Sequence, residues 1–138
     1  MTFLRRPPLG VRTPKQRAGA AAEEAAAKYL KQHGCEILAR NARYREGELD
    51  IVAREGGLML FVEVRLRNDN RYGGAGASVD EFKRRRLLRA AQHFLLEHYG
   101  DGAGGGRRQG GWPACRFDVV TADAQGVTEW IRDAFTAD

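Results

Sequence analysis

Two strand-like runs decide the fold of this chain, GELDIV at residues 47–52 and LFVEVR at residues 60–65. Both runs are apolar enough for buried β-strands, yet the first contains Asp50 and the second contains Glu63. The turn-like residues 54–57 between them predict a hairpin that brings the two acids side by side. Because a buried carboxylate is costly unless it is paired, neutralised or ligated, this pair predicts a site for a divalent metal ion.

Length and composition indicate one domain without a membrane segment. The 138 residues suffice for a hydrophobic core, and no run approaches the roughly 18 apolar residues of a membrane span. The N-terminus has arginines but no apolar segment, so we expect no secretory signal. Cys35 and Cys115 lie far apart without the spacing of a zinc site or a disulfide framework. A cytoplasmic protein is therefore expected.

Positive charge is unevenly distributed along the chain. Of 23 basic residues, five fall in residues 1–17, which contain no acid, so the remainder is neutral with 18 basic and 18 acidic residues. This proline-containing start predicts a flexible basic arm, followed by one domain at 18–138 with a flexible glycine-rich loop at 100–111. Within the domain, KRRR at 83–86 forms a basic patch. Such charges suit a nucleic-acid partner, although a solvated helix face is the alternative.

Hydrophobic periodicity predicts the remaining elements. Helical spacing predicts helices, and alternation or short apolar runs predict strands, in this order: helix 17–32, strands 35–39, 48–53 and 58–66, helix 79–98, strand 115–121 and helix 127–135. The last helix rests on apolar residues at i, i+3, i+4, i+7 and i+8. The hairpin is antiparallel, and the helical connection to the fourth strand favours a parallel neighbour. We therefore expect a single α/β domain with a mixed central β-sheet flanked by helices.

The acidic residues define a candidate metal site. Asp50 and Glu63 supply two carboxylates, the carbonyl of Val64 offers a third oxygen, and Glu48 shares the strand parity of Asp50. Helical phase turns Glu23 towards the core, where it would bind a second ion or a metal-bound water. Carboxylates and carbonyls suit Mg²⁺ or Mn²⁺, and phosphodiester hydrolysis is the reaction that fits.

Basic residues complete the prediction. Arg65 lies two residues beyond Glu63 on the same strand face, where it can orient and stabilise charge but cannot act as a base. Lys83 projects inward from the second helix and would take over part of that role. The alternatives are ion pairs between the acids and strand arginines, and a lysine at the core edge. The candidates for nucleic-acid contact are Arg67, Arg71, Arg84, Arg85, Arg107 and Arg108.

These positions also carry a family resemblance. The spacing of Asp50, Glu63 and Arg65 is similar to the Asp…(Asp/Glu)-x-Lys signature of the restriction-endonuclease-like superfamily. The surrounding residues resemble the bacterial YraN family from Gly19 to Phe135, through Glu23, Asn41, GELD at 47–50, FVEVR at 61–65, YGGA at 72–75, Lys83, RFDVV at 116–120 and WI at 130–131.

The resemblance implies both a fold and an activity. It implies an endonuclease-like fold of order α-β-β-β-α-β-α, similar to archaeal Holliday-junction resolvases, with Glu23, Asp50 and Glu63 as the acidic site. Arg65 then occupies the place of the superfamily lysine. The implied function is a metal-dependent nuclease acting on structured or branched DNA, and a resolvase-like role suggests a two-fold dimer. The alternatives are a non-catalytic nucleic-acid-binding module, because of Arg65, and a protein-interaction domain.

Overall fold

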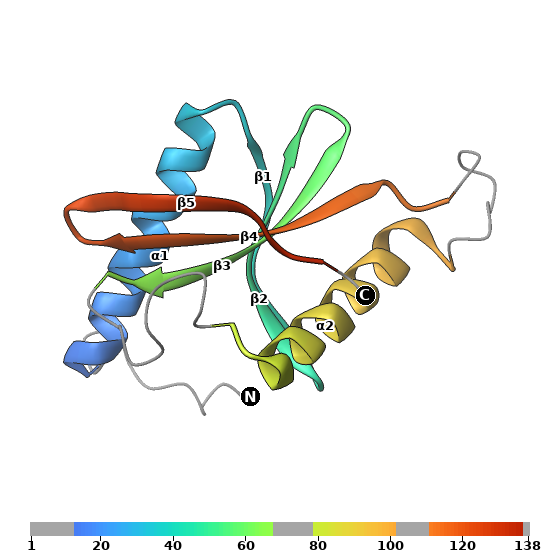
Figure 1. Cartoon of the computed structure of the whole chain (residues 1–138), viewed down its shortest axis with the longest axis horizontal. Helices are drawn as coiled ribbons and strands as arrows, with labels where there is room; N and C mark the ends of the chain where they lie inside the picture. Colours follow the sequence, from blue (N-terminus) through green and yellow to red (C-terminus); the bar gives the residue numbers. More distant parts are fainter. Residues whose placement is uncertain (1–12, 68–78, 102–110, 137–138) are drawn as a thin grey trace, which may run out of the picture.

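A mixed five-stranded β-sheet with a long helix on each face forms the molecule, in a computed structural model that describes residues 13–67, 79–101 and 111–136 (Figure 1). The elements in chain order are α1 (Pro14–Gln32), β1 (Glu36–Tyr44), β2 (Gly47–Glu55), β3 (Leu58–Leu66), α2 (Glu81–Tyr99), β4 (Ala114–Asp123) and β5 (Gly126–Phe135).

The strands follow one another across the sheet in chain order. β1, β2 and β3 are antiparallel neighbours, β4 runs parallel to β3, and β5 returns antiparallel to β4. The predicted hairpin and the predicted parallel neighbour are both confirmed. The connection between the two parallel strands contains α2, as a crossover requires.

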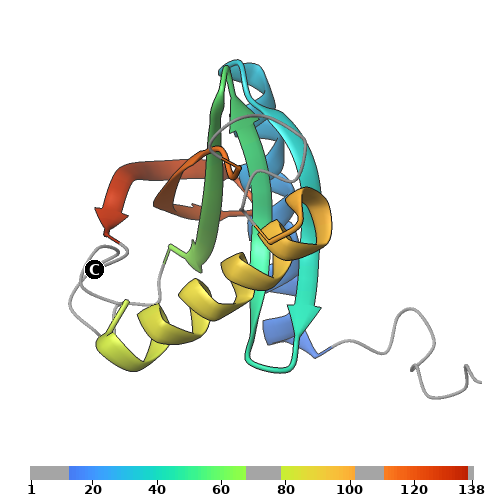
Figure 2. The ribbon, with the colours of Figure 1, turned by 90° about the vertical axis from the view of Figure 1, so that its right-hand side faces the viewer.

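Two hydrophobic cores lie on opposite faces of the sheet, and β3 contributes to both. Its even positions, including Leu60 and Val62, pack with Leu30 of α1. Its odd positions begin with Met59 and Phe61, which pack against α2. This alternation follows from the two-residue repeat of a strand. It places Glu63, the next odd-numbered residue, on the face of the sheet that α2 covers. Figure 2 shows α1 and α2 on the two sides of the sheet.

The first helix begins earlier than its apolar pattern predicts. Thr13 caps it, accepting a hydrogen bond from the backbone N–H of Gln16 at 3.1 Å while the Gln16 side chain accepts from the backbone of Thr13 at 2.9 Å. Pro14 occupies the first helical position, where its missing N–H would have no helical partner. The predicted arm at 1–17 is therefore wrong in its final residues, and the rest of it lies outside the described residues.

The predicted helix at 127–135 is wrong, because these residues form strand β5. The register between β4 and β5 shifts twice, so the side chains of β5 do not keep a simple alternation. Trp130 packs with the α1 core, whereas the neighbouring Ile131 and Ala134 pack with the α2 core. Because apolar residues of this bulged strand pack on both faces of the sheet, they recur at the i, i+3 and i+4 intervals that are typical of an amphipathic helix.

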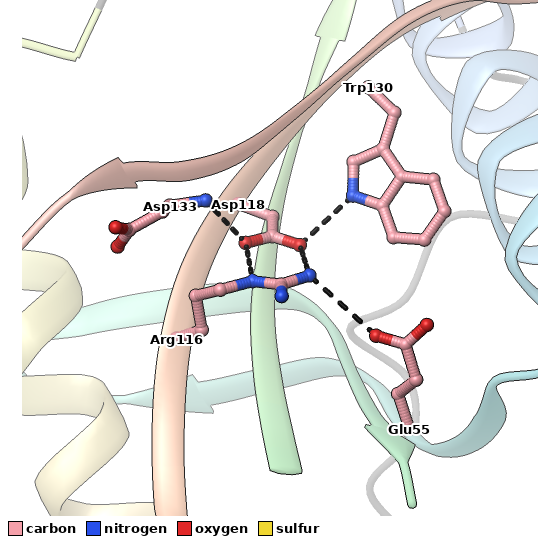
Figure 3. Close-up of polar contacts among 5 residues, drawn as sticks. All are labelled: Glu55, Arg116, Asp118, Trp130 and Asp133. Carbon is pink, nitrogen blue, oxygen red and sulfur yellow. Dashed lines mark hydrogen bonds and ion pairs between the residues drawn. The ribbon is translucent and has the colours of Figure 1, made fainter.

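A buried carboxylate anchors β5 to β4 (Figure 3). Asp118 of β4 has a side chain that is 0 % exposed, and Arg116 donates to it from Nε at 2.8 Å and Nη2 at 2.9 Å. Trp130 Nε1 donates at 2.9 Å, and the backbone N–H of Asp133 donates at 3.0 Å. Arg116 also lies 3.8 Å from Glu55. Because protein donors occupy both oxygens of Asp118, this acid is structural.

The length and composition of the two helices decide whether either could span a membrane. Neither helix within residues 13–67, 79–101 and 111–136 combines the length and apolar character that crossing a membrane requires.

Candidate functional site

The candidate site lies where β2 and β3 separate. Their ladder runs from Glu55 opposite Leu58 to Ile51 opposite Val62. Beyond that pair, β2 continues to pair with β1 and β3 continues to pair with β4, so the two central strands diverge (Figure 1). The backbone N–H of Val64 donates to the side-chain Oδ2 of Asp50 at 2.9 Å, and not to the backbone of β2. The acids of the two strands therefore stand at the opening of the sheet.

Glu63 is held from two sides by cations. Its side chain is 6 % exposed, and Lys83 Nζ of α2 lies 3.1 Å from its Oε2. Arg65 Nε lies 3.6 Å from the same oxygen. The predicted inward direction of Lys83 is confirmed, because the first turn of α2 aims it at the strand end. These two contacts place positive charge directly against Glu63.

Asp50 carries the strongest electrostatic signature of the site. Burial is the main cause that raises its pKa well above the usual range, and the neighbouring charge of Glu63 raises it further. The hydrogen bond from Val64 opposes both effects, and Glu23 and Glu48 add smaller repulsions. The predicted approach of Asp50 and Glu63 is therefore confirmed. A group that is buried next to like charge gains strongly from a bound cation.

Glu23 approaches these acids from α1. Burial raises its pKa, while a hydrogen bond with Asn41 and the charge of Arg40 lower it, and Glu63 lies close enough to raise it again. The next residue, Glu24, is exposed and pairs with Arg40 at 2.9 Å. The predicted contrast between an inward Glu23 and an outward Glu24 is confirmed. These two residues make a matched pair for experiments.

Sequence reasoning from local pattern did not assign a role to Asn41 or Thr121. Asn41 adopts a left-handed backbone conformation (φ 53°) within β1 and bonds Glu23, and an asparagine inside a strand was the available signal. Thr121 of β4 lies opposite Arg65 in register, and its buried Oγ1 has no hydrogen-bond partner among the described residues. A threonine in a strand carries no such signal, because only the register places it there.

The rim of the site is more polar. Glu48 is partly exposed and lies 3.4 Å from Arg43, so it stands at the edge of the acid group. Among the arginines predicted to contact nucleic acid, Arg67 is exposed and lies 3.4 Å from Asp123.

The other predicted nucleic-acid contacts divide into two groups. Arg84 and Arg85 are exposed on α2, where Arg84 Nε donates to the carbonyl of Val79 and Arg85 lies 3.9 Å from Glu81. The positions that fall outside the described residues are Arg71, Arg107 and Arg108.

The four acids predicted to bind metal, Glu23, Glu48, Asp50 and Glu63, do not converge as one metal-binding cluster in the described residues. No group of three or more His, Cys, Asp or Glu side chains in the described parts of the chain converges as a metal-binding cluster. Mg²⁺, however, is usually bound by one or two carboxylates, with water and substrate phosphate completing its shell. Asp50 and Glu63 supply two carboxylates that interact electrostatically, as the raised pKa of Asp50 shows, and this number of carboxylates fits that pattern.

Comparisons with known proteins place these residues within one family. The model of the uncharacterised protein family UPF0102 matches residues 22–122. A UPF0102 protein of Xanthomonas campestris is 49 % identical over 125 residues, covering 90 % of this chain and 95 % of the relative. One from Halorhodospira halophila is 48 % identical over 122 residues, covering 88 % of each. One from Ralstonia nicotianae is 46 % identical over 121 residues, covering 85 % of each.

Proposed function

We propose, for a chain that belongs to the UPF0102 (YraN) family, that it is a metal-dependent nuclease hydrolysing phosphodiester bonds in structured or branched DNA in the cytoplasm. The observation that carries the proposal is the meeting of Asp50 and Glu63 where β2 and β3 part, with the pKa of Asp50 raised by burial and by Glu63. Asp118, the structural acid of this fold, differs because four protein donors bond its two carboxylate oxygens.

Asp50 and Glu63 are the residues that would hold the cation, with Glu23 and Glu48 nearby. A bound divalent ion would supply Lewis-acid polarisation of a phosphoryl oxygen. Lys83 already touches Glu63 at 3.1 Å, so its ammonium group stands where it can orient a nucleophilic water and stabilise negative charge. Arg65 contributes positive charge from the strand, without the ability to accept a proton.

A second candidate function rests on the same pair of cations. Lys83 and Arg65 both lie against Glu63, and they neutralise the acid without a metal ion. This arrangement favours a nucleic-acid-binding module on a nuclease scaffold, in which the basic surface binds phosphates and turnover is weak. The two functions differ in one measurable property, which is metal-dependent cleavage.

The test compares four DNA substrates of equal length: linear duplex, flap, fork and four-way junction. Each is incubated with the full chain in Mg²⁺, in Mn²⁺ and in EDTA. Cleavage of the branched forms that requires metal and disappears in Glu63→Ala supports the nuclease. Salt-sensitive binding without cleavage supports the module. Absence of both would refute the two proposals together.

Matched variants sharpen the assignment of residues. Glu23→Ala should reduce cleavage, whereas Glu24→Ala, which removes an exposed acid from the adjacent helical position, should not. Arg65→Lys should cut as well as or better than the natural chain, because lysine can orient and deprotonate water. A clear loss in that variant would count against the alignment of this strand with the superfamily signature.

A junction-cutting role also implies a two-fold dimer, since a four-way junction presents two equivalent strands. Sedimentation of the chain with and without junction DNA tests this part of the proposal, and a strictly monomeric active species would contradict it.

A further inference from the structure

The first half of α2 exposes an aromatic ring among arginines. Phe82 is 67 % exposed, and the other large apolar side chain exposed in the described residues is Leu96 at 46 %, in the second half of the same helix. A single exposed apolar residue is ordinary on a protein surface, so the surroundings of each side chain matter. Those of Phe82 are strongly basic.

Helical spacing assembles this surface. Phe82, Arg86 and Arg89 recur at i, i+4 and i+7 along one side of α2, and Arg85 adjoins them, all four exposed. The guanidinium of Arg86 lies over the Phe82 ring at 5.7 Å from its centre. This contact holds a cation against one side of the ring. We refer to Phe82, Arg85, Arg86 and Arg89 as the α2 stripe.

The turn between β1 and β2 packs against α2 at Arg86, a member of the stripe. Gly47 packs so closely on α2 that an added Cβ would lie 2.8 Å from the backbone oxygen of Arg86. Two turns farther along the same side of α2, His93 Nε2 lies 2.7 Å from Glu46, which belongs to the same turn. Arg45 of this turn is exposed. The ring of Phe82 has one arginine over it, and the stripe holds two further exposed arginines in the same half of the helix.

The stripe borders the acidic site. Lys83 is adjacent to Phe82 in the chain, yet it turns inward to Glu63 at 3.1 Å. A nucleic acid whose backbone reaches Glu63 and Asp50 would therefore lie along the start of α2. Phosphates would satisfy the arginines, but they offer no partner for an exposed phenyl ring.

We infer that Phe82, backed by Arg86, stacks on an unpaired base, so that this protein recognises DNA with a single-stranded segment beside the acidic site. In a duplex, both faces of each base are covered by its neighbours, whereas an unpaired base offers a free face to an aromatic side chain. The inference rests on the proposed contact with DNA and deepens it by naming the substrate class. It does not require turnover.

The experiment measures binding by fluorescence anisotropy in EDTA, at one fixed salt concentration, for a single-stranded oligonucleotide and a blunt duplex of the same length. Phe82→Ala should weaken single-strand binding by about 5- to 150-fold, the range expected for loss of one stacked base, and change duplex binding little. Phe82→Trp should retain single-strand binding. Leu96→Ala is the matched control, with an exposed apolar residue of the same helix removed, and it should leave both affinities unchanged.

A 2-aminopurine base within the single strand gives a second measurement. Stacking on Phe82 should change its fluorescence when the natural chain binds, and Phe82→Ala should abolish that change. Equal losses of affinity for single strand and duplex would overturn the inference, because they would indicate a general effect on the basic surface. No loss for either would also overturn it, because Phe82 would then contribute nothing to nucleic-acid binding.

Failure of this inference is separable from failure of the nuclease proposal. Metal-dependent cleavage that depends on Glu63 but is indifferent to Phe82 would leave the nuclease standing and remove the stacking site. Selective loss of single-strand binding in Phe82→Ala, without cleavage by the natural chain, would do the reverse. A natural chain that binds no nucleic acid would refute both.

Discussion

Replacing Asp118 by alanine should destabilise the protein severely. The change removes the acceptor of four hydrogen bonds at a side chain that is 0 % exposed, including both bonds from Arg116. Removing one partner of a buried ion pair costs about 3–5 kcal/mol, because the other charge remains buried. Arg116 is 20 % exposed and retains Glu55 at 3.8 Å, so we expect about 3–4 kcal/mol, near the lower end.

Urea unfolding followed by circular dichroism measures this loss. With a slope of about 2 kcal/mol per M, the midpoint should fall by about 1.5–2 M. Glu24→Ala, which breaks the exposed pair with Arg40, should leave the midpoint essentially unchanged. A midpoint for Asp118→Ala that equals the natural one would refute the anchoring role of this network.

A double substitution keeps the test decisive if the single variant folds poorly. Arg116→Met added to Asp118→Ala removes the guanidinium that would otherwise lie partly buried without its carboxylate. The double variant should therefore be more stable than Asp118→Ala alone. If the double variant loses as much stability, relative to the natural chain, as Asp118→Ala and Arg116→Met lose together, the two side chains do not act as a pair.

Three further predictions concern the site and its supports. Asp50→Asn should raise the free energy of unfolding at neutral pH and make it depend less on pH, as measured by urea titrations at several pH values. The pKa of Asp50 is raised in the folded state, so its contribution to stability is complete below the unfolded-state pKa and is lost as pH rises through the raised value. A steeper pH dependence in the variant would contradict this. Burial and the bond to Glu97 raise the pKa of Tyr44 to about 12, so stability should fall between the ordinary tyrosine pKa of about 10 and that value, and Tyr44→Phe should flatten the fall. Gly47→Ala should lower the melting temperature through a cost of about 1–3 kcal/mol, since its Cβ would meet α2 backbone at 2.8 Å, and an unchanged value would show that the turn can move away.

Much of the fold follows from local pattern. The alternation of β3 predicts its bounds, Leu58–Leu66, and the capping residue Asp80 marks the start of α2. β1 extends to Tyr44, beyond the predicted 35–39, because its second half is a charged edge strand with Arg40 and Arg43 towards solvent. Periodicity detects a strand by its buried face, so a largely exposed edge strand gives little signal.

In the candidate site, too, local pattern predicted some features and not others. The hairpin and the phase of α2 predicted the approach of Asp50, Glu63 and Lys83, since both depend on spacing within short segments. The hydrogen bond from Val64 to Asp50 and the place of Thr121 beside Arg65 could not be predicted, because they arise from strands that diverge and from the β3–β4 register.

The amino-acid sequence by itself determined a mixed sheet with two acids on neighbouring strands and a lysine turned towards them. Hydrophobic period and turn chemistry act over a few residues, and a single chain displays them directly. Only the tertiary structure decided that residues 127–135 form a bulged strand, that Asp118 is bound by four donors, and that the sheet opens at Asp50. Those features depend on contacts between distant segments, which satisfy buried polar groups in ways that local spacing does not encode.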